Sequence, residues 1–418
     1  MVGGGEEGQT VALSPLSADE TLFRLPRSSC LTLSTSRLGG LLHPASASAV
    51  AALSPWLQLV LVLMHESRED DSPWRPYLDL LPARFDTLMY WRPHELDWLR
   101  GSKVVDKIGR ASAEATFLRE LLPVVRANPT VFGAVAASEE GLLETAHHMA
   151  SVVMAYSFDL AVNGDEDDED DDDDDDDDDD GYGAEKHYKA MVPLADLLNA
   201  DVPANCRLFQ TAAHLEMRTL VPVPAGEQLF NDYGPLPRSD LLRRYGYTTR
   251  NYAVYDVVEI PAPMVIAHCG GGGEDRIEHL LEEGVLDDSF DLEAEAQGQV
   301  PDEVVVVVNT LLASDEEFRA WKAKGKLPKP RISEDAAEVL ARVVQQRLGE
   351  YPTSIEEDER LLETGVAGRE KDAIEVRLGE KRILRATYRE LERKVNEKKR
   401  AAATEAGTGD RSAKRVRP

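Results

Sequence analysis

Two short stretches of the sequence carry polar side chains whose types and spacing suit the binding and orientation of a ligand. The first, Pro193–Asp201, is an apolar segment that ends in Asn199-Ala200-Asp201. A buried asparagine offers two donors and an acceptor, and can fix a ligand by its edge. The second, Gly226–Gly234, reads as a strand that ends with the phenol of Tyr233 beside a flexible glycine. Each stretch alone is also typical of ordinary structure, a turn or cap in the first and a packed tyrosine in the second.

Other sequence patterns that could indicate a metal site, a phosphate site or a catalytic site are weak. The adjacent His147 and His148 would point in different directions on a helix, and no His-Glu-x-x-His pattern indicates a metal site. Gly270–Gly273 lacks the following Gly-Lys-Ser/Thr of a phosphate-binding loop. A hydrolase of the Gly-x-Ser-x-Gly type has no matching elbow in the sequence. The three cysteines are far apart in sequence, which argues against a disulfide framework or a cysteine-rich zinc site.

Composition and charge indicate a globular protein with an acidic insert. With 418 residues, 42% of them hydrophobic, the chain is long enough for two or three domains. Of the formal charge of −30, sixteen units lie in the unbroken run Asp165–Asp180, which leaves −14 for the rest. We expect this run to be a solvated, disordered loop. The charge favours a basic protein as the partner rather than a nucleic acid.

The cysteine usage and the apolar segments indicate where the protein resides. Free cysteines indicate a reduced, intracellular protein. The first residues lack the basic flank and apolar stretch of a signal peptide. The most apolar segment, Trp56–Met64, is half the length of about 20 residues that a membrane helix needs, so we expect no membrane association.

Hydrophobic periodicity predicts the elements that position the two stretches. Short strands are expected at residues 10–13 and 21–26. Ser54 and Pro55 are typical of a helix start. The predicted apolar face of that helix comprises Trp56, Leu59, Val60 and Leu63. Helical patterns then continue to about residue 160, and strand-like segments fill residues 191–247.

A second region begins near Asn251. Val304–Val308 fits either a strand, because its residues are β-branched, or a buried helix entered through Pro301. From Ser333 the apolar spacing is that of helices. One predicted helix face comprises Val339, Leu340, Val343, Val344 and Leu348, and another comprises Ile383, Leu384, Tyr388, Leu391 and Val395.

Together and in this order, the two stretches resemble the carboxyl half of a SET domain, the fold of protein-lysine methyltransferases that use S-adenosyl-L-methionine. Further segments are similar to the Rubisco-methyltransferase-like branch of that family, in the family's order. These segments are Glu20–Arg27, Trp74–Pro82, Met89–Trp91, Ala155–Phe158, Tyr351–Asp358 and Glu380–Leu384. Within the branch, Met191–Asp201 is most similar to the fungal ribosomal lysine N-methyltransferase 4 group, which also reads Asn-Ala-Asp where most SET domains have Asn-His.

The resemblance implies a role for individual residues. Tyr233 would be the catalytic tyrosine, whose hydroxyl orients the amine and the methyl group, and Tyr245 would help to close the pocket. The implied cofactor-binding residues are Gly8, Phe158, Asn199, Ala200, Tyr233 and Tyr245. The implied substrate-binding residues are Ala155, Asp196 and Tyr245. No residue is assigned to a metal.

The family's cofactor loop, Gly-x-Gly, falls at Glu7-Gly8-Gln9, where only the middle residue is glycine. A side chain at the other two positions adds a Cβ that can block positive φ and close backbone approach. We therefore expect the chain to bind S-adenosyl-L-methionine weakly, and Glu7→Gly with Gln9→Gly to tighten binding. This loop is the observation that supports an alternative function, a catalytically inactive SET fold that binds basic proteins.

The resemblance predicts an α+β fold, a SET domain of small curled β-sheets with a helical insert, followed by an all-α substrate-binding domain. The expected substrate is a lysine of a non-histone protein, a ribosomal protein of the large subunit, and the expected state is a monomer. Two basic clusters, Lys398-Lys399-Arg400 and Lys414–Arg417, are typical of a nuclear import signal. The predicted boundaries are 1–52 and 191–250 for the SET domain, 53–160 for the insert, 161–190 for the acidic loop, 251–400 for the helical domain and 401–418 for a basic flexible tail.

Overall fold

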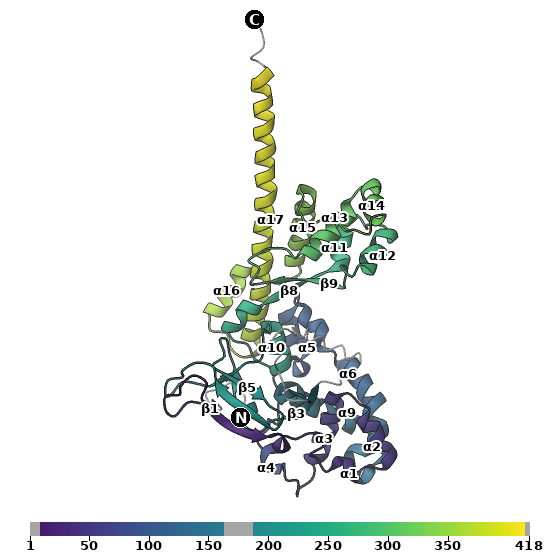
Figure 1. Cartoon of the computed structure of the whole chain (residues 1–418), viewed down its shortest axis with the longest axis vertical. Helices are drawn as coiled ribbons and strands as arrows, with labels where there is room; N and C mark the ends of the chain where they lie inside the picture. Colours follow the sequence, from purple (N-terminus) through teal and green to yellow (C-terminus); the bar gives the residue numbers. More distant parts are fainter. Residues whose placement is uncertain (1–8, 163–186, 414–418) are drawn as a thin grey trace. The chain divides into compact units, whose positions relative to one another are not determined.

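A computed structural model gives the fold of the chain and describes residues 9–162 and 187–413, with side chains up to residue 396 (Figure 1). The chain divides into two units. The described parts of 1–90, 108–234 and 241–251 form the first unit, and those of 91–107, 235–240 and 252–418 form the second. Gly8, Glu7, the acidic run and Lys414–Arg417 lie outside the described residues.

The strands of the first unit form small sheets, as the sequence predicts. One sheet has the order β1-β6-β5, with both pairs antiparallel, while β2 pairs antiparallel with β3 and β4 pairs parallel with β7. Their core includes Leu160, Leu208, Leu215 and Met217. The strands are β1 (Thr21–Pro26), β2 (Ser157–Ala161), β3 (His187–Met191), β4 (Asn199–Ala200), β5 (Cys206–Gln210), β6 (His214–Thr219) and β7 (Phe230–Asn231).

The helices of the first unit surround α3 and α9. Ser54 Oγ accepts a hydrogen bond from the Leu57 amide and Pro55 is the first residue of α3, so the predicted helix start is confirmed. The predicted apolar face is buried in the core, and burial extends beyond it to Leu61, Val62 and Met64, so most of α3 is enclosed. The helices are α1 (Leu38–Leu41), α2 (Pro44–Ala51), α3 (Pro55–Glu66), α4 (Arg75–Leu78), α6 (Arg110–Thr116), α7 (Leu122–Ala127), α8 (Pro129–Phe132) and α9 (Glu139–Tyr156).

The second unit is helical apart from one antiparallel sheet, β8 (Val257–Pro261) with β9 (Ser289–Glu293). This sheet corrects the expectation of an all-α domain. Every second residue of its two strands is buried in the core of the unit, namely Val258, Ile260, Phe290 and Leu292. Its helices are α5 (Pro93–Leu96), α11 (Ala262–His268), α12 (Glu274–Glu282), α13 (Asp302–Leu312), α14 (Asp315–Lys322), α15 (Glu334–Leu348), α16 (Ile355–Glu363) and α17 (Arg369–Ala413), and α10 (Arg238–Tyr245) runs across the division between the units.

The two apolar faces predicted in this unit are confirmed. Val339, Leu340, Val343 and Val344 of α15 share a core with Leu384 and Leu391 of α17. Val304–Val308 lies in α13 and is a buried helix rather than a strand. Its β-branched residues favour a strand only weakly, and burial in the core outweighs that preference.

A buried ionic cluster joins α16 to α17 within the second unit. Asp358, which has no exposed surface, accepts hydrogen bonds from Arg377 Nη2 at 2.6 Å and from Lys381 Nζ at 2.6 Å. Although burial opposes it, these hydrogen bonds lower the pKa of Asp358. Arg377 also donates to the Trp98 carbonyl, which explains why residues 91–107 belong to this unit despite their distance in sequence.

Several boundaries differ from the predicted ones. The helical part begins at Leu38 rather than at residue 53, because α1 and α2 pack with α3. Strand β3 occupies residues 187–190 of the predicted acidic loop. The predicted flexible tail is helical over residues 401–413, where α17 continues. Within the described parts of the chain, no helix combines the length and the apolar character needed to cross a membrane.

Candidate active site

The parallel pair β4–β7 brings the two polar stretches together. Asn199 lies opposite Phe230, and Ala200 lies opposite Asn231. The side chain of Asn205 holds this arrangement, because its Oδ1 accepts from the Phe230 amide at 2.7 Å and its Nδ2 donates to the Gln228 carbonyl at 2.8 Å. The residues that precede Tyr233 are therefore fixed beside Asn199.

The N-terminal segment closes on the same two stretches. The Thr10 hydroxyl donates to the Leu197 carbonyl at 3.0 Å, and the Thr10 carbonyl accepts from the Leu229 amide at 2.8 Å. Ala12 exchanges backbone hydrogen bonds with Gly226 and Glu227. Gly8 is outside the described residues, but Thr10, two positions later, lies against the strands that carry the site.

Tyr233 is held by its ring and by its hydroxyl. Its ring stacks on that of Tyr245, with 4.6 Å between the centroids and 28° between the planes. Its hydroxyl donates to the Leu198 carbonyl at 3.2 Å. Asp232 shapes the turn that follows, since its carboxylate accepts from the Gly234 amide at 3.0 Å and from Arg207 at 2.7 Å.

Tyr245 and Tyr247 flank a position that requires glycine. Gly246 has φ +80°, and a Cβ there would lie 2.7 Å from the Asp86 carbonyl carbon. Any larger residue at this position would be strained in its backbone and would collide with residues 86–87. The close approach places Tyr247 so that its hydroxyl donates to the Ala200 carbonyl at 3.3 Å.

Asp201, which follows β4, is hydrogen-bonded to residues 249–251, the segment after these tyrosines. Its carboxylate accepts from the Thr249 hydroxyl at 2.8 Å and from Asn251 Nδ2 at 3.0 Å. The sequence shows Asp201 beside Asn199 but gives no sign of this role, because the partners are about fifty residues away.

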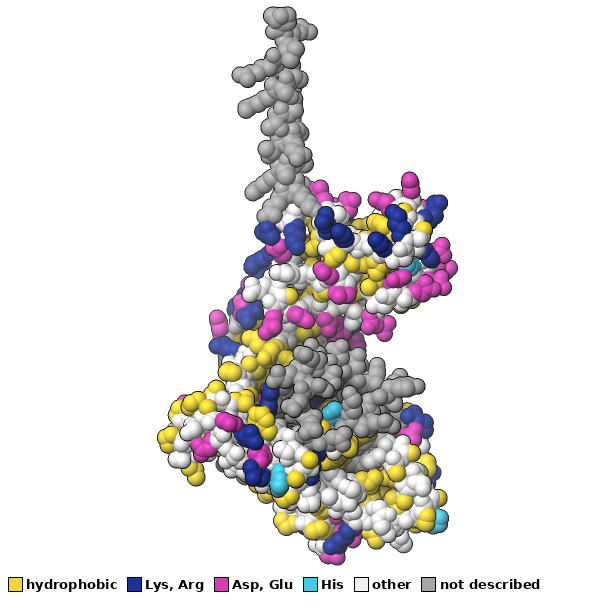
Figure 2. All heavy atoms as spheres, viewed as in Figure 1, with side chains coloured by type: hydrophobic (Ala, Val, Ile, Leu, Met, Phe, Trp, Pro, Cys, Tyr) yellow, Lys and Arg dark blue, Asp and Glu magenta, His cyan; other side chains and the backbone are white. Residues whose placement is uncertain are grey.

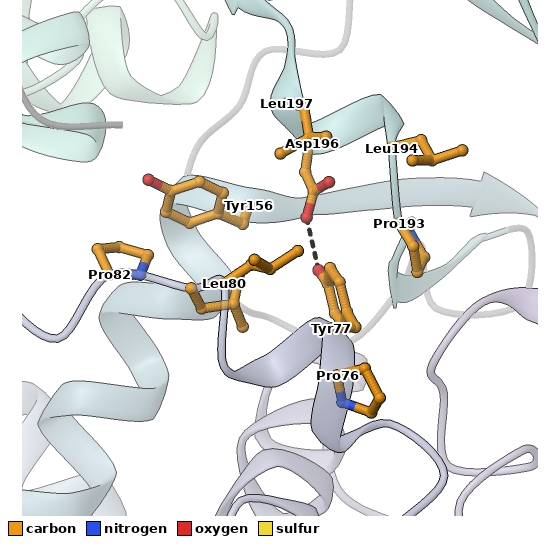
Figure 3. A pocket seen from close by; sticks show the side chains of 10 residues that line it. Pro76, Tyr77, Leu80, Pro82, Tyr156, Pro193, Leu194, Asp196 and Leu197 are labelled. Atoms are coloured by element: carbon orange, nitrogen blue, oxygen red, sulfur yellow. Dashed lines mark hydrogen bonds between the residues drawn. The ribbon is translucent and has the colours of Figure 1, made fainter. Parts of the chain in front are cut away.

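A pocket lies beside the loop that precedes β4, where the Asp196 side chain meets the helical insert (Figure 3). Asp196 is 6% exposed, and its Oδ2 accepts from the Tyr77 hydroxyl at 2.6 Å. Its Oδ1 is buried and has no hydrogen-bond partner in the described structure. The cavity volume is about 250 Å³. Its lining comprises Pro76, Tyr77, Leu80, Leu81, Pro82, Tyr156, Pro193, Leu194, Asp196 and Leu197.

Burial dominates the electrostatics of this pocket. It raises the pKa of Asp196 to about 6, against the opposing effect of the Tyr77 hydrogen bond. Burial and the Asp196 carboxylate raise the pKa of Tyr77 well above its usual value and that of Tyr156 to about 12. At neutral pH the pocket therefore holds one carboxylate and two neutral phenols.

The described residues contain no group of three or more histidine, cysteine, aspartate or glutamate side chains that could hold a metal ion. The two residues that the sequence singled out as a weak metal pattern have other contacts. His147 Nε2 lies 3.2 Å from Glu114, and His148 packs edge-on against Phe85.

Comparison with known proteins agrees with this geometry. Residues 274–384 match the family model described as Rubisco LSMT substrate-binding. Ribosomal lysine N-methyltransferase 4 of Saccharomyces cerevisiae is 32% identical over 60% of this chain, which covers 51% of the yeast protein. N-lysine methyltransferase SETD6 of Mus musculus is 28% identical over 90% of this chain and 82% of its own length. The chain is similar to SET-domain lysine methyltransferases. The proteins that it resembles are Rubisco LSMT, SETD6 and ribosomal lysine N-methyltransferase 4.

Solved structures show the same fold. The structure of Rubisco LSMT bound to AdoMet has a TM-score of 0.65 at 20% identity, and the match covers 93% of this chain and 85% of that chain. The SET domain of LSMT bound to lysine and AdoHcy has a TM-score of 0.66 over the same coverage. The predicted SET fold with a C-terminal helical domain is confirmed.

The SET-domain residues named from the sequence fall into two groups. Tyr233, Tyr245, Asn199 and Ala200 lie together around β4 and β7, whereas the Asp196 side chain lies in the pocket with Tyr77. The two remaining residues, Ala155 at the end of α9 and Phe158 in β2, are half-buried and flank the pocket residue Tyr156 without being part of its lining. The roles assigned to all these residues stay predictions.

Sequence reasoning missed two residues of this SET-domain site. Tyr77 lies 119 positions from its partner Asp196, and only the likeness of Trp74–Pro82 to the helical insert drew attention to its segment. Asn205 bridges two strands through its side-chain amide, and nothing in its neighbourhood in sequence indicates this function.

Proposed function

We propose that the chain transfers a methyl group from S-adenosyl-L-methionine to a lysine of a ribosomal protein of the large subunit. The observation that carries this proposal is the hydroxyl of Tyr233, which is fixed by stacking on Tyr245 and is directed at the Leu198 carbonyl. A phenol held in this way can orient a small polar group beside it, which is what methyl transfer to an amine requires.

The residues around β4 and β7 fit a cofactor that carries a sulfonium cation. The carbonyl oxygens of Leu198 and Ala200 and the rings of Tyr233 and Tyr245 present partial negative charge, and no cationic side chain is among these four residues. When bound, the cofactor supplies an electrophilic methyl group. Asn199, Ala200, Tyr233 and Tyr245 would hold it there, together with Gly8 and Phe158 as the resemblance implies.

The chain's own part in the reaction is positioning and desolvation. A lysine amine must be neutral and aligned with the methyl group, and burial in a narrow channel lowers the pKa of a lysine because it disfavours the charged form. The oxygen atoms of the Tyr233 hydroxyl and the Leu198 carbonyl, 3.2 Å apart, would accept hydrogen bonds from that amine and leave its lone pair directed at the methyl group. Orientation of this kind can contribute on the order of 7–11 kcal/mol to lowering a barrier.

The charge of the chain supports a basic protein as its substrate. The formal charge is −30, and acidic side chains gather over the second unit on the face shown in Figure 2. The exposed acidic residues of α12 and α14 are Glu274, Asp275, Glu278, Glu282, Asp315, Glu316 and Glu317. A negative surface attracts basic segments over a range of about 10 Å at moderate salt.

The ribosomal substrate is supported by the likeness to ribosomal lysine N-methyltransferase 4 of Saccharomyces cerevisiae and Schizosaccharomyces pombe. Nuclear residence is part of the same proposal and rests on the two basic clusters of the sequence, Lys398-Lys399-Arg400 and Lys414–Arg417. A tagged chain that is equally distributed with and without residues 398–418 would contradict nuclear import through these clusters.

Incubation of the purified chain with methyl-labelled S-adenosyl-L-methionine and dissociated large-subunit ribosomal proteins tests the function. We expect label in one or a few proteins, on lysine, as read by mass spectrometry. Label on other proteins alone would overturn the ribosomal assignment. Cofactor binding below a micromolar dissociation constant with no transfer to any lysine, or no binding at all, would favour the non-catalytic module instead.

A further inference from the structure

Asp201 links two parts of the candidate active site, and the proposed function leaves it without a role. It directly follows β4 and is half-buried. Its Oδ1 accepts hydrogen bonds from the Thr249 hydroxyl at 2.8 Å and from the Val202 amide at 2.9 Å. Its Oδ2 accepts one from Asn251 Nδ2 at 3.0 Å. Three donors thus converge on one carboxylate, and two of them belong to a segment about fifty residues later in the chain.

The residues bound by Asp201 come directly after the tyrosine segment, residues 245–247. Tyr245 is the last residue of α10, and Gly246 is fixed by its close approach to residues 86–87. Tyr247 is two residues before the first of the two side chains that donate to Asp201. The tyrosine segment is therefore held by the contact of Gly246 and, on its carboxyl side, by the hydrogen bonds to Asp201.

The tyrosine segment contacts the residues that would hold the cofactor. The ring of Tyr245 stacks on that of Tyr233, with 4.6 Å between the centroids. The Tyr247 hydroxyl donates to the Ala200 carbonyl at 3.3 Å. The resemblance assigns Tyr245, Tyr233 and Ala200 to the cofactor. A shift of the tyrosine segment would therefore move groups around the cofactor, although Asp201 itself is not one of them.

The hydroxyl of Tyr233 is held by a different part of the unit. The Asn205 side chain fixes β7, which precedes Tyr233 in the chain. The Tyr233 hydroxyl donates to the Leu198 carbonyl. Neither contact involves Asp201. Loss of the Asp201 hydrogen bonds should therefore change how tightly the cofactor binds, and should leave the orientation of the Tyr233 hydroxyl in place.

We propose that Asp201 is a positioning residue that sets the affinity for S-adenosyl-L-methionine. Its hydrogen bonds to Thr249 and Asn251 hold the tyrosine segment against β4 before the cofactor binds. A segment that is already ordered loses less conformational entropy on binding, and the cofactor binds more tightly for that reason. The inference rests on the proposed function and deepens it, because it names a residue that acts on the cofactor only through other residues.

Calorimetric titration of the full chain with S-adenosyl-L-methionine measures this affinity. Asp201→Ala removes the acceptor of all three hydrogen bonds, so we expect it to raise the dissociation constant at least tenfold. The single-turnover rate of methyl transfer at saturating cofactor should stay within threefold of the wild type, because Tyr233 is held elsewhere. A dissociation constant equal to that of the wild type would overturn the proposal, as would a lower rate with unchanged affinity.

An exchange of donor and acceptor tests the contact between Asp201 and Asn251. Asp201→Asn should weaken cofactor binding at least fivefold, because the new NH2 group faces either that of Asn251 or the Val202 amide. Asn251→Asp alone should also weaken binding, because two carboxylates would then face each other. Together the two substitutions restore a donor opposite an acceptor, and the dissociation constant should return to within threefold of the wild type. A double variant as weak as Asp201→Asn would overturn the proposal.

Glu216→Gln is the matched control, because it also removes a carboxylate that links strands of the first unit. Glu216 is 5% exposed and is paired with Arg24 at 2.5 Å and with Arg218 at 2.6 Å. The substitution should lower the stability of the unit and leave the affinity for the cofactor within twofold. If it weakens cofactor binding as much as Asp201→Asn does, Asp201 acts only through stability, and its positioning role is overturned.

Hydrogen exchange of the cofactor-free chain gives a second readout. Asp201→Asn should speed amide exchange in residues 245–251 and leave that of β1 unchanged, and the double variant should restore slow exchange. Unchanged exchange in residues 245–251 would contradict the proposal. Cofactor binding by the wild type without transfer to any lysine would contradict only the proposed function, whereas a wild type that binds no cofactor would overturn both.

Discussion

Two buried carboxyl groups, one in each unit, have similar pKa values and different surroundings. Burial raises the pKa of Asp196 to about 6 and that of Glu380 to about 7. Both oxygens of Glu380 accept hydrogen bonds, Oε1 from Ser102 at 2.6 Å and Oε2 from Tyr351 at 2.8 Å. Asp196 has such a partner for only one oxygen in the described structure.

The difference separates a structural carboxyl group from one that is available to a ligand. Glu380 links α17 to Ser102 and to Tyr351, and its hydrogen bonds hold the second unit together. Asp358, also in that unit, is paired with Arg377 and Lys381. Asp196 instead borders a cavity with an unpaired oxygen, an arrangement that costs stability unless something binds there. We infer that Glu380 and Asp358 stabilise the second unit, whereas Asp196 in the first unit is available to a ligand.

The largest expected effect is loss of the ionic cluster of the second unit. Asp358→Asn leaves Arg377 and Lys381 buried without a counter-charge, and should lower the free energy of unfolding by about 3–5 kcal/mol. Urea unfolding measures it. Glu359→Gln is the control, because its ion pair with Arg382 is exposed and should change stability by less than about 1 kcal/mol. Equal losses of unfolding free energy for the two substitutions would contradict the structural role of the buried cluster.

Asp196→Asn should change the dependence of stability on pH. The folded-state pKa is raised from 3.8 to about 6, so protonated Asp196 contributes stability below pH 4 that is lost as the pH rises through 6. The variant lacks this loss. Its stability relative to the wild type should therefore rise by about 2 kcal/mol between pH 4 and pH 8, as measured by urea unfolding.

Glu380→Gln is the counterpart in the second unit. The pKa of Glu380 is also raised, from 4.5 to about 7, so the stability that the protonated group contributes is present below pH 4.5 and is lost as the pH rises through 7. At pH 5 the protonated carboxyl, like the amide, offers one donor and one acceptor to the two hydroxyls, so the variant should be about as stable as the wild type there. A variant more stable than the wild type at pH 5 would show that Glu380 is no better satisfied than Asp196.

The smallest expected effect concerns the hydrogen bond that holds Asp196. Tyr77→Phe leaves both oxygens without that hydroxyl and should cost about 1 kcal/mol at pH 8. In the Asp196→Asn background the cost should differ, because residues in direct contact couple by about 0.5–3 kcal/mol. A double-mutant cycle by urea unfolding measures the coupling, and strict additivity would contradict the contact.

The sequence predicts local features better than distant contacts. The start of α3 and the faces of α15 and α17 follow from capping and periodicity over a few residues. The burial of α3 on every side depends on helices far along the chain, and the union of 91–107 with the second unit depends on contacts such as Arg377 with Trp98.

The site shows the same limit. Asn199 and Tyr233 could be named because they stand in recognisable order in two short stretches, and Tyr245 because of its place after them in the family's order. The Tyr77–Asp196 hydrogen bond spans 119 positions and has no local signature. Periodicity and composition report on neighbours in sequence, and only the folded chain shows that a hydroxyl of the insert satisfies half of a buried carboxylate.

The most direct test of the account is the rate of methyl transfer by Tyr233→Phe. The substitution keeps the ring that stacks on Tyr245 and removes the hydroxyl directed at the Leu198 carbonyl. We predict a single-turnover rate at least 30-fold lower, or a loss of about 2 kcal/mol of transition-state stabilisation. The unfolding midpoint should be unchanged. The affinity for S-adenosyl-L-methionine should stay within twofold of that of the wild type, because the stacked ring is kept. Equal rates of transfer by the two proteins would contradict the central role of Tyr233.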